Sequence, residues 1–157
     1  MNQIDWIINE IKTNPNSRRI FMSAWNPADL KKMCLPPCHV SAQFHVRDGK
    51  YLSCHMYQRS CDTFLGLPFY IASYSLLTYL IASKTGLIPE ELILSFGNVH
   101  IYSNHVEQVK EQLKREPLPW CKLEITDTDW TWETLTSDKI KIIDYQSHPP
   151  IKAPMAV

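Results

Sequence analysis

The stretch Val40–Arg59, VSAQFHVRDGKYLSCHMYQR, decides the fold of this chain. Apolar and polar side chains alternate on both sides of Asp48-Gly49, and an Asp-Gly pair between alternating runs is a strong hairpin signal. The stretch therefore predicts two antiparallel strands joined by a tight turn. Cys38 stands at the entry to the first strand, and Arg59 lies near the exit of the second. We expect the hairpin to bring this thiol and this guanidinium to one end of a sheet.

Cys38 belongs to the run Leu35–His39, LPPCH. Each proline fixes its own φ and restricts the residue before it, so we expect the thiol on a stiff arm. A thiol held in that way is a candidate nucleophile. Taken alone, the run is more typical of a cysteine that packs as a small apolar side chain than of a catalyst.

The segments around the hairpin complete an α+β pattern. Isoleucines at helical spacing from Ile4 to Ile11 predict an amphipathic helix. A helix from Pro68 to about Ser83 is apolar on most sides, so we expect it in the core. The other elements expected are strands at 20–24, 92–102, 122–126 and 139–145, one or two helical turns at 28–33, a helix capped by Asn104 that carries Val106, Val109 and Leu113, and an extended tail at 148–157.

Composition limits the classes of protein to consider. The chain has 157 residues, of which 45% are hydrophobic, and this predicts one domain over residues 1–157 with a sizeable core. Sixteen basic and sixteen acidic residues give a formal net charge of zero, so we expect neither DNA nor a membrane surface as a partner. The longest apolar stretch, residues 71–82, is too short to span a bilayer.

Cysteine usage indicates a reducing compartment. The five cysteines are Cys34, Cys38, Cys54, Cys61 and Cys121. Their number is odd, no CxxC pair or zinc-ligand spacing occurs, and no secretory segment begins the chain. We therefore expect free thiols, a cytoplasmic location and no metal.

Several motifs, in order and at approximately the family's spacing, resemble thymidylate synthase. They are SRRI at 17–20, SAWN at 23–26, PCH at 37–39, YQRSCD at 57–62, FLGLPF at 64–69, IASY at 71–74, HIYSNH at 100–105 and the tail at 148–157. The resemblance covers almost the whole chain. It implies an α+β fold in which a mixed sheet packs against a long buried helix. It also implies that the N-terminal part of the family's fold is missing.

The resemblance implies the reductive methylation of dUMP to dTMP. The co-substrate would be 5,10-methylenetetrahydrofolate, which supplies both the carbon and the hydride. Cys38 would be the catalytic nucleophile that attacks C6 of the uracil, so that one difficult step becomes two easier ones. The family also implies a homodimer in which Arg18 and Arg19 reach into the neighbouring site.

The resemblance also assigns binding roles. A planar guanidinium such as that of Arg59 suits a phosphate dianion. Alternation along a strand would place His100 and Tyr102 on one face, where both would bind the deoxyribose hydroxyl. The expected dUMP contacts are Arg18, Arg19, Arg59, Ser60, Cys61, Asp62, Tyr70, His100 and Tyr102. The expected folate contacts are Asp62, Leu65, Gly66, Phe69 and Ala156, the last in a C-terminal lid that excludes water.

The chain departs from the family pattern in three ways. The missing N-terminal part carries the family's proton-managing glutamate, folate-contacting tryptophans and one phosphate arginine. Tyr70 stands where the family has an asparagine, whose amide offers the uracil edge both a donor and an acceptor. We expect the phenol to weaken base recognition or to crowd the pocket. Asn98 replaces an aspartate, which removes a negative charge near His100.

Two other hypotheses remain open. One is a pyrimidine nucleotide hydroxymethylase, which shares the fold and the nucleophile but adds water in place of hydride. Base choice in that enzyme depends on the position held here by Tyr70. The other is a non-catalytic remnant that dimerises or binds nucleotide without turnover.

Overall fold

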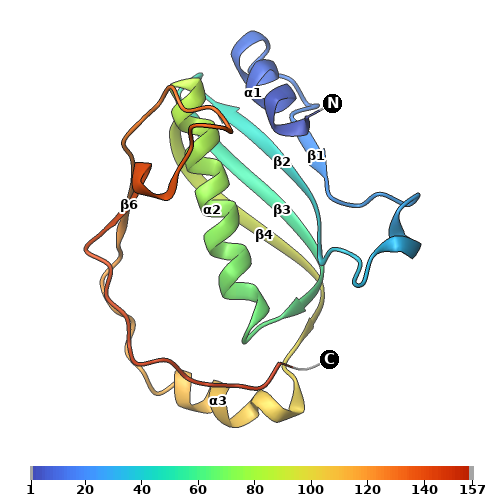
Figure 1. Ribbon diagram of the computed structural model, residues 1–157, viewed down its shortest axis with the longest axis vertical. Helices are drawn as coiled ribbons and strands as arrows, with labels where there is room; N and C mark the ends of the chain where they lie inside the picture. The colour runs from blue at the N-terminus through green and yellow to red at the C-terminus, as the bar shows by residue number, and fades with distance from the viewer. Residues whose placement is uncertain (1, 156–157) are drawn as a thin grey trace.

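The computed structural model of the protein describes residues 2–155 and contains a four-stranded sheet with a long helix across one face (Figure 1). The strands, in spatial order, are β1 (Phe21–Ser23), β2 (His39–Arg47), β3 (Tyr51–Asp62) and β4 (Ile88–His100). The first three are antiparallel neighbours, whereas β3 and β4 run parallel. A parallel pair needs a crossover, which α2 (Gly66–Thr85) supplies. The predicted α+β fold with a mixed sheet is confirmed.

The predicted hairpin is present in the expected register. Arg47 is paired with Tyr51, and the turn between them holds Asp48 at a φ of 55° and Gly49 at a φ of 62°. Left-handed backbone of this kind favours glycine and tolerates aspartate, which is why the Asp-Gly pair is such a strong local signal.

The strand β4 differs from the segment predicted from sequence. It begins at Ile88, which pairs with Tyr51, and it ends at His100, which pairs with Asp62. Pairing with β3 along its whole length determines where β4 begins and ends. The local sequence pattern of β4 does not reveal this pairing. Tyr102 therefore lies beyond the strand, so the expectation that strand alternation places it beside His100 is wrong.

The helix α2 begins two residues before Pro68 and ends at Gly86, which adopts a left-handed φ of 70°. Its buried side chains are Tyr74, Thr78, Leu80, Ile81 and Ala82. Phe69 and Ile71 are exposed. The expectation of a helix buried on most sides is therefore met on one face only, because the described residues cover only that face.

In length and composition, α2 would suit a membrane span, and it is longer than the apolar stretch that sequence alone suggested. Only 28% of the relevant window is buried within the protein. The core helix of a water-soluble fold passes the same test, so this is weak evidence for a membrane.

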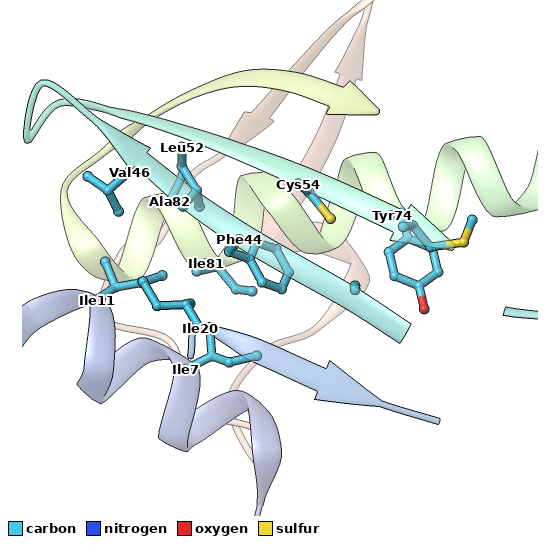
Figure 2. Close-up of a cluster of buried hydrophobic side chains, with 12 residues drawn as sticks. Ile7, Ile11, Ile20, Phe44, Val46, Leu52, Cys54, Tyr74, Ile81 and Ala82 are labelled. Carbon is cyan, nitrogen blue, oxygen red and sulfur yellow. The ribbon is translucent and has the colours of Figure 1, made fainter. Parts of the chain in front are cut away.

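The core lies between the sheet, α2 and α1 (Gln3–Thr13) (Figure 2). Asn2 caps α1 by accepting a hydrogen bond from the Ile4 amide at 3.0 Å, and Ile7 and Ile11 then point into the core. They meet Phe44 from β2 and Ile81 from α2 (Figure 2). The predicted N-terminal amphipathic helix is confirmed.

The remaining elements are short. They are η1 (Leu30–Lys32), η2 (Ser103–His105), α3 (Val106–Gln112), β5 (Lys122–Ile125), η3 (Ser137–Lys139) and β6 (Ile140–Ile143). β5 and β6 form a separate antiparallel pair. Asn104 does not cap α3, because it lies within the 3-10 turn that precedes that helix. The tail is extended as far as residue 155 and runs along α3 (Figure 1).

Candidate functional site

Cys38 is half-buried immediately before β2. The amide of Arg59 donates to the Cys38 carbonyl at 2.9 Å, so β3 holds the backbone of the thiol directly. The β2–β3 register shifts between His39 and Ser41, and irregularities of this kind often occur beside functional sites. The predicted meeting of Cys38 and Arg59 at one end of the sheet is present.

The Arg59 side chain locks the arm that carries Cys38. Its Nε donates to the carbonyl of Pro37 at 3.0 Å, and its Nη2 donates to that of Pro36 at 2.8 Å. The guanidinium also lies 5.5 Å from the ring of Trp25. Within residues 2–155, Nη1 has no acceptor, so one edge of the guanidinium remains available to an anion.

Two rings, those of His39 and Tyr70, lie beside the nucleophile, and a third, that of Tyr74, contacts His39. His39 Nδ1 lies 2.6 Å from the Tyr74 hydroxyl, and the His39 ring packs 5.4 Å from that of Tyr70. Burial lowers the pKa of His39, so its imidazole is neutral at neutral pH. Burial, followed by the nearby Cys38 thiol, raises the pKa of Tyr70. Tyr70 therefore offers a neutral hydroxyl beside the sulfur, where an asparagine would offer an amide.

Burial distinguishes two of the other cysteines, Cys61 and Cys54, from the half-buried Cys38. Burial raises the pKa of Cys61, and Asp62 and Cys38 raise it further. Cys54 is fully buried, and burial raises its pKa to about 12. Both thiols stay protonated at neutral pH and are poor nucleophiles. Because Cys61 is also fully buried, its expected contact with dUMP would have to come from its main chain.

Asp62 closes the turn that leads into α2. Its Oδ1 accepts hydrogen bonds from the amides of Phe64 at 3.1 Å and Leu65 at 3.3 Å. The side chain is half-buried, and its second oxygen remains to accept from a ligand. Ser60, also half-buried, precedes it by two residues on β3.

His100 and Tyr102 meet despite the end of the strand between them. Their rings form an edge-to-face pair with centroids 5.1 Å apart. His100 Nδ1 lies 2.9 Å from Asn98 Oδ1, which can only accept, so Nδ1 carries the hydrogen. Nε2 is then an acceptor, which suits a sugar hydroxyl. The neutral Asn98 thus fixes the His100 tautomer without the charge of the family's aspartate.

Arg18 and Arg19 lie away from Cys38 of the same chain. They are exposed in the loop before β1, and the Arg18 carbonyl accepts a hydrogen bond from Gln43 at 3.3 Å. Gln43 is separated from Cys38 along β2 by roughly 16 Å, at the usual rise per strand residue. The structure therefore does not bring this pair to the nucleophile within one chain.

The expected folate residues lie at the start of α2. Leu65 and Phe69 line a hollow of about 680 Å³ that is also bordered by Trp120 and His148. Gly66 is the first residue of α2, and a Cβ there would sit 3.4 Å from Asp62 Cβ. Cys38 is not among the residues that line this hollow. Ala156 lies outside the described residues.

Sequence reasoning missed the parts played by Trp25 and Gln58. Trp25 stacks against Arg59, and only the SAWN motif singled it out. Gln58 is fully buried and donates to the Ser60 carbonyl at 2.8 Å, while its Oε1 has no partner among residues 2–155. The sequence signal that could have identified Gln58 was its position within the YQRSCD motif. Across the same residues, no group of three or more histidine, cysteine or acidic side chains could hold a metal ion.

Comparison with known proteins identifies the family. The sequence model of the thymidylate synthase family matches residues 1–157. A thymidylate synthase of Human herpesvirus 8 type P (isolate GK18) is 52% identical over 155 residues, which is 99% of this chain and 46% of that relative. The chain thus spans about half the length of the curated relative it matches. It belongs to the thymidylate synthase family.

Proposed function

We propose that this chain is the nucleophile-bearing part of an enzyme that converts dUMP to dTMP with 5,10-methylenetetrahydrofolate. One observation carries the proposal: Arg59 locks the proline arm of Cys38 and leaves a guanidinium edge available to an anion. Structural cysteines have no need of a cation beside them, whereas a thiol that attacks a nucleotide does.

Cys38 begins the proposed reaction. Its sulfur forms a bond to C6 of the uracil, and the electrons of the C5–C6 double bond move towards the ring carbonyl. C5 becomes nucleophilic and takes the carbon of the folate. C5 then loses its proton and the bond between the transferred carbon and the folate nitrogen breaks, which leaves an exocyclic methylene and tetrahydrofolate. Hydride from the tetrahydrofolate passes to the methylene and the sulfur leaves C6, which gives dTMP and dihydrofolate. The nucleophile is therefore regenerated in each turnover.

The remaining residues bind and orient the substrates. Arg59 and Ser60 take the phosphate, and His100 Nε2 with the Tyr102 hydroxyl takes the deoxyribose hydroxyl. Asp62 accepts from the base and the pterin through the oxygen that its turn leaves available. Leu65, Gly66 and Phe69 form the folate wall, and Ala156 belongs to the lid that closes on it.

In a homodimer, each site would receive arginines that its own chain does not bring near Cys38. Because Arg18 and Arg19 lie far from Cys38 along the sheet, we propose that they serve the site of a second copy. Analytical ultracentrifugation that finds only a monomer would contradict this arrangement. The location we propose is the cytoplasm. This proposal of location is based on the five free cysteines, since a reducing compartment keeps thiols unpaired.

The covalent step can be tested by intact-mass spectrometry. We expect wild-type chain mixed with 5-fluoro-dUMP and methylenetetrahydrofolate to gain the mass of both ligands, because fluorine at C5 blocks the later steps. Cys38→Ala should gain none. Cys34→Ala removes an exposed thiol nearby and should react like wild type.

The experiment needs two arms, because the chain spans 46% of the herpesvirus relative. In one arm the chain is alone, and in the other it is mixed with the N-terminal part of that relative. Absence of the adduct in both arms, with nucleotide still bound in calorimetry, would replace the synthase proposal with the non-catalytic alternative.

Tyr70 gives the hydroxymethylase hypothesis a specific basis. A neutral hydroxyl beside Cys38 is able to orient a water molecule, and water is what that reaction adds at the exocyclic methylene. The products distinguish the two. A synthase releases dihydrofolate and a methylated nucleotide, whereas a hydroxymethylase releases tetrahydrofolate and a nucleotide that retains an added oxygen. We expect mass spectrometry of the nucleotide to show the methyl product.

A further inference from the structure

His105 is a buried histidine that the proposed reaction does not use. It is fully buried in the 3-10 turn before α3. Its ring packs against Phe64, with centroids 5.6 Å apart, and against Tyr102, with centroids 5.7 Å apart. Its Nε2 lies 2.6 Å from the carbonyl oxygen of Pro154. The ring thus touches residues beside both proposed ligand sites and also touches the C-terminal tail.

The tail contact fixes the tautomer of His105. A carbonyl oxygen can only accept, so Nε2 carries the hydrogen and donates it. Nδ1 is then an acceptor, and it is buried without a partner among residues 2–155. A buried polar atom left unpaired is costly, and such atoms in native structures call for an explanation. The polar interaction of this side chain is directed entirely at the tail.

The tail, residues 148–155, is held at two places. Near its start, His148 Nε2 donates to the Glu116 carbonyl at 2.9 Å, and Arg115 donates to the Pro149 carbonyl. These contacts are at the surface. Near the far end of the tail, the contact is that of buried His105 with Pro154. This contact lies two residues before Ala156.

We propose that His105 is a positioning residue that fixes the far end of the tail beside the nucleotide pocket. Tyr102 packs against both His100 and His105, so an unbroken row of rings joins the proposed sugar contacts to the tail. The hydrogen bond from His105 to Pro154, which we call the tether, does not depend on the proposed function. A further role of His105, in holding the tail closed over bound folate, rests on the proposed function.

Two variants separate the hydrogen bond from the ring. His105→Gln places an amide Nε2–H near the position of the imidazole Nε2–H. His105→Asn carries the same amide one carbon shorter and cannot reach Pro154. The amides of Ile151, Lys152 and Ala153 donate no backbone hydrogen bond within the described residues, so their mobility is followed by 15N relaxation. We expect their order parameters to fall below about 0.6 in the Asn variant, the range of flexible backbone. The Gln variant should stay close to wild type.

A truncation after Ala153 guards against misfolding of these variants. It removes the acceptor and leaves His105 intact, so the order parameters of residues 151–153 should fall to the same extent as in the Asn variant. Order parameters like those of the wild type in either the truncated chain or a folded Asn variant would overturn the proposal. Equal order parameters in the Gln and Asn variants would overturn it as well.

Adduct formation keeps the tether distinct from the proposed function. The 15N relaxation of the tail is measured without ligands and judges the tether alone. In the fluoro-dUMP experiment, the Asn variant should need about fivefold more methylenetetrahydrofolate, with an unchanged nucleotide dissociation constant. An unchanged folate requirement would overturn the role of His105 in closure. A wild-type chain that forms no adduct contradicts the proposed function and leaves the relaxation result standing.

Discussion

At the residue scale, Tyr70 is the departure from the family pattern with the clearest consequence. Burial and the Cys38 thiol raise its pKa, so the phenol is neutral in the working range of pH. It presents one hydroxyl to a base edge that needs both a donor and an acceptor, and an unpaired polar edge costs roughly 1–3 kcal/mol. The residue therefore works against tight binding of uracil.

We expect Tyr70→Asn to tighten dUMP binding about tenfold or more, as measured by calorimetry. The amide would pair with the base edge, and the smaller side chain would open the space beside Cys38. Tyr70→Phe is the matched control, since it keeps the ring and removes the hydroxyl, and it should not tighten binding. An Asn variant that binds dUMP no better than wild type would refute this account.

The arrangement of Cys38 and Arg59 could be predicted from sequence, but the detail of their contact could not. Local alternation and one Asp-Gly turn are enough to place both residues at the same end of a hairpin. The guanidinium, however, donates to the Pro36 and Pro37 carbonyls, and those partners come from the path of a loop. Loop paths depend on many weak contacts that carry no periodic signal.

At the element scale, Gly97 allows β4 to lie close against β3 beside Arg59. A Cβ there would come within 2.8 Å of the Arg59 carbonyl oxygen and 3.0 Å of the Tyr57 hydroxyl. The first of these atoms belongs to the backbone and cannot move aside without shifting the strand. The close approach of the two strands therefore supports the position of the residue that locks the cysteine arm.

We expect Gly97→Ala to destabilise the fold by about 1–3 kcal/mol and to slow adduct formation at Cys38 as well. Urea unfolding and the rate of the fluoro-dUMP reaction measure the two effects. Gly86→Ala is the control. Gly86 has open space around it and a left-handed φ of 70°, so the change should cost roughly 1–2 kcal/mol without slowing the reaction. Equal rates in the two variants would count against a role for strand spacing.

The elements that sequence predicted well are those formed by neighbours in the chain. The hairpin and α1 follow from alternation, capping and turn chemistry within a few residues. The bounds of β4 depend instead on pairing with β3, which precedes it by the whole of α2, so the local pattern wrongly extends the strand beyond His100 to Tyr102. The local pattern also misplaces the start of α3, because Asn104 belongs to a 3-10 turn.

At the scale of the whole molecule, the chain carries more apolar surface than its own residues cover. Phe69 is 74% exposed and Trp120 is 96% exposed. A helix as apolar as α2 is normally covered on all sides, but residues 2–155 pack against only one of its faces. The herpesvirus relative has about as much chain again outside the matched region. We expect that part to pack against this face.

We expect the 157-residue chain on its own to bind the dye ANS, because contiguous exposed apolar surface is what the dye detects. Adding the N-terminal part of the herpesvirus relative should lower the fluorescence as that part covers α2. The variant Phe69→Ser, Trp120→Ser removes two exposed apolar side chains and should bind less dye at an unchanged melting temperature. Fluorescence that does not respond to the added part would show that it does not cover this face, and α2 would then need a different partner.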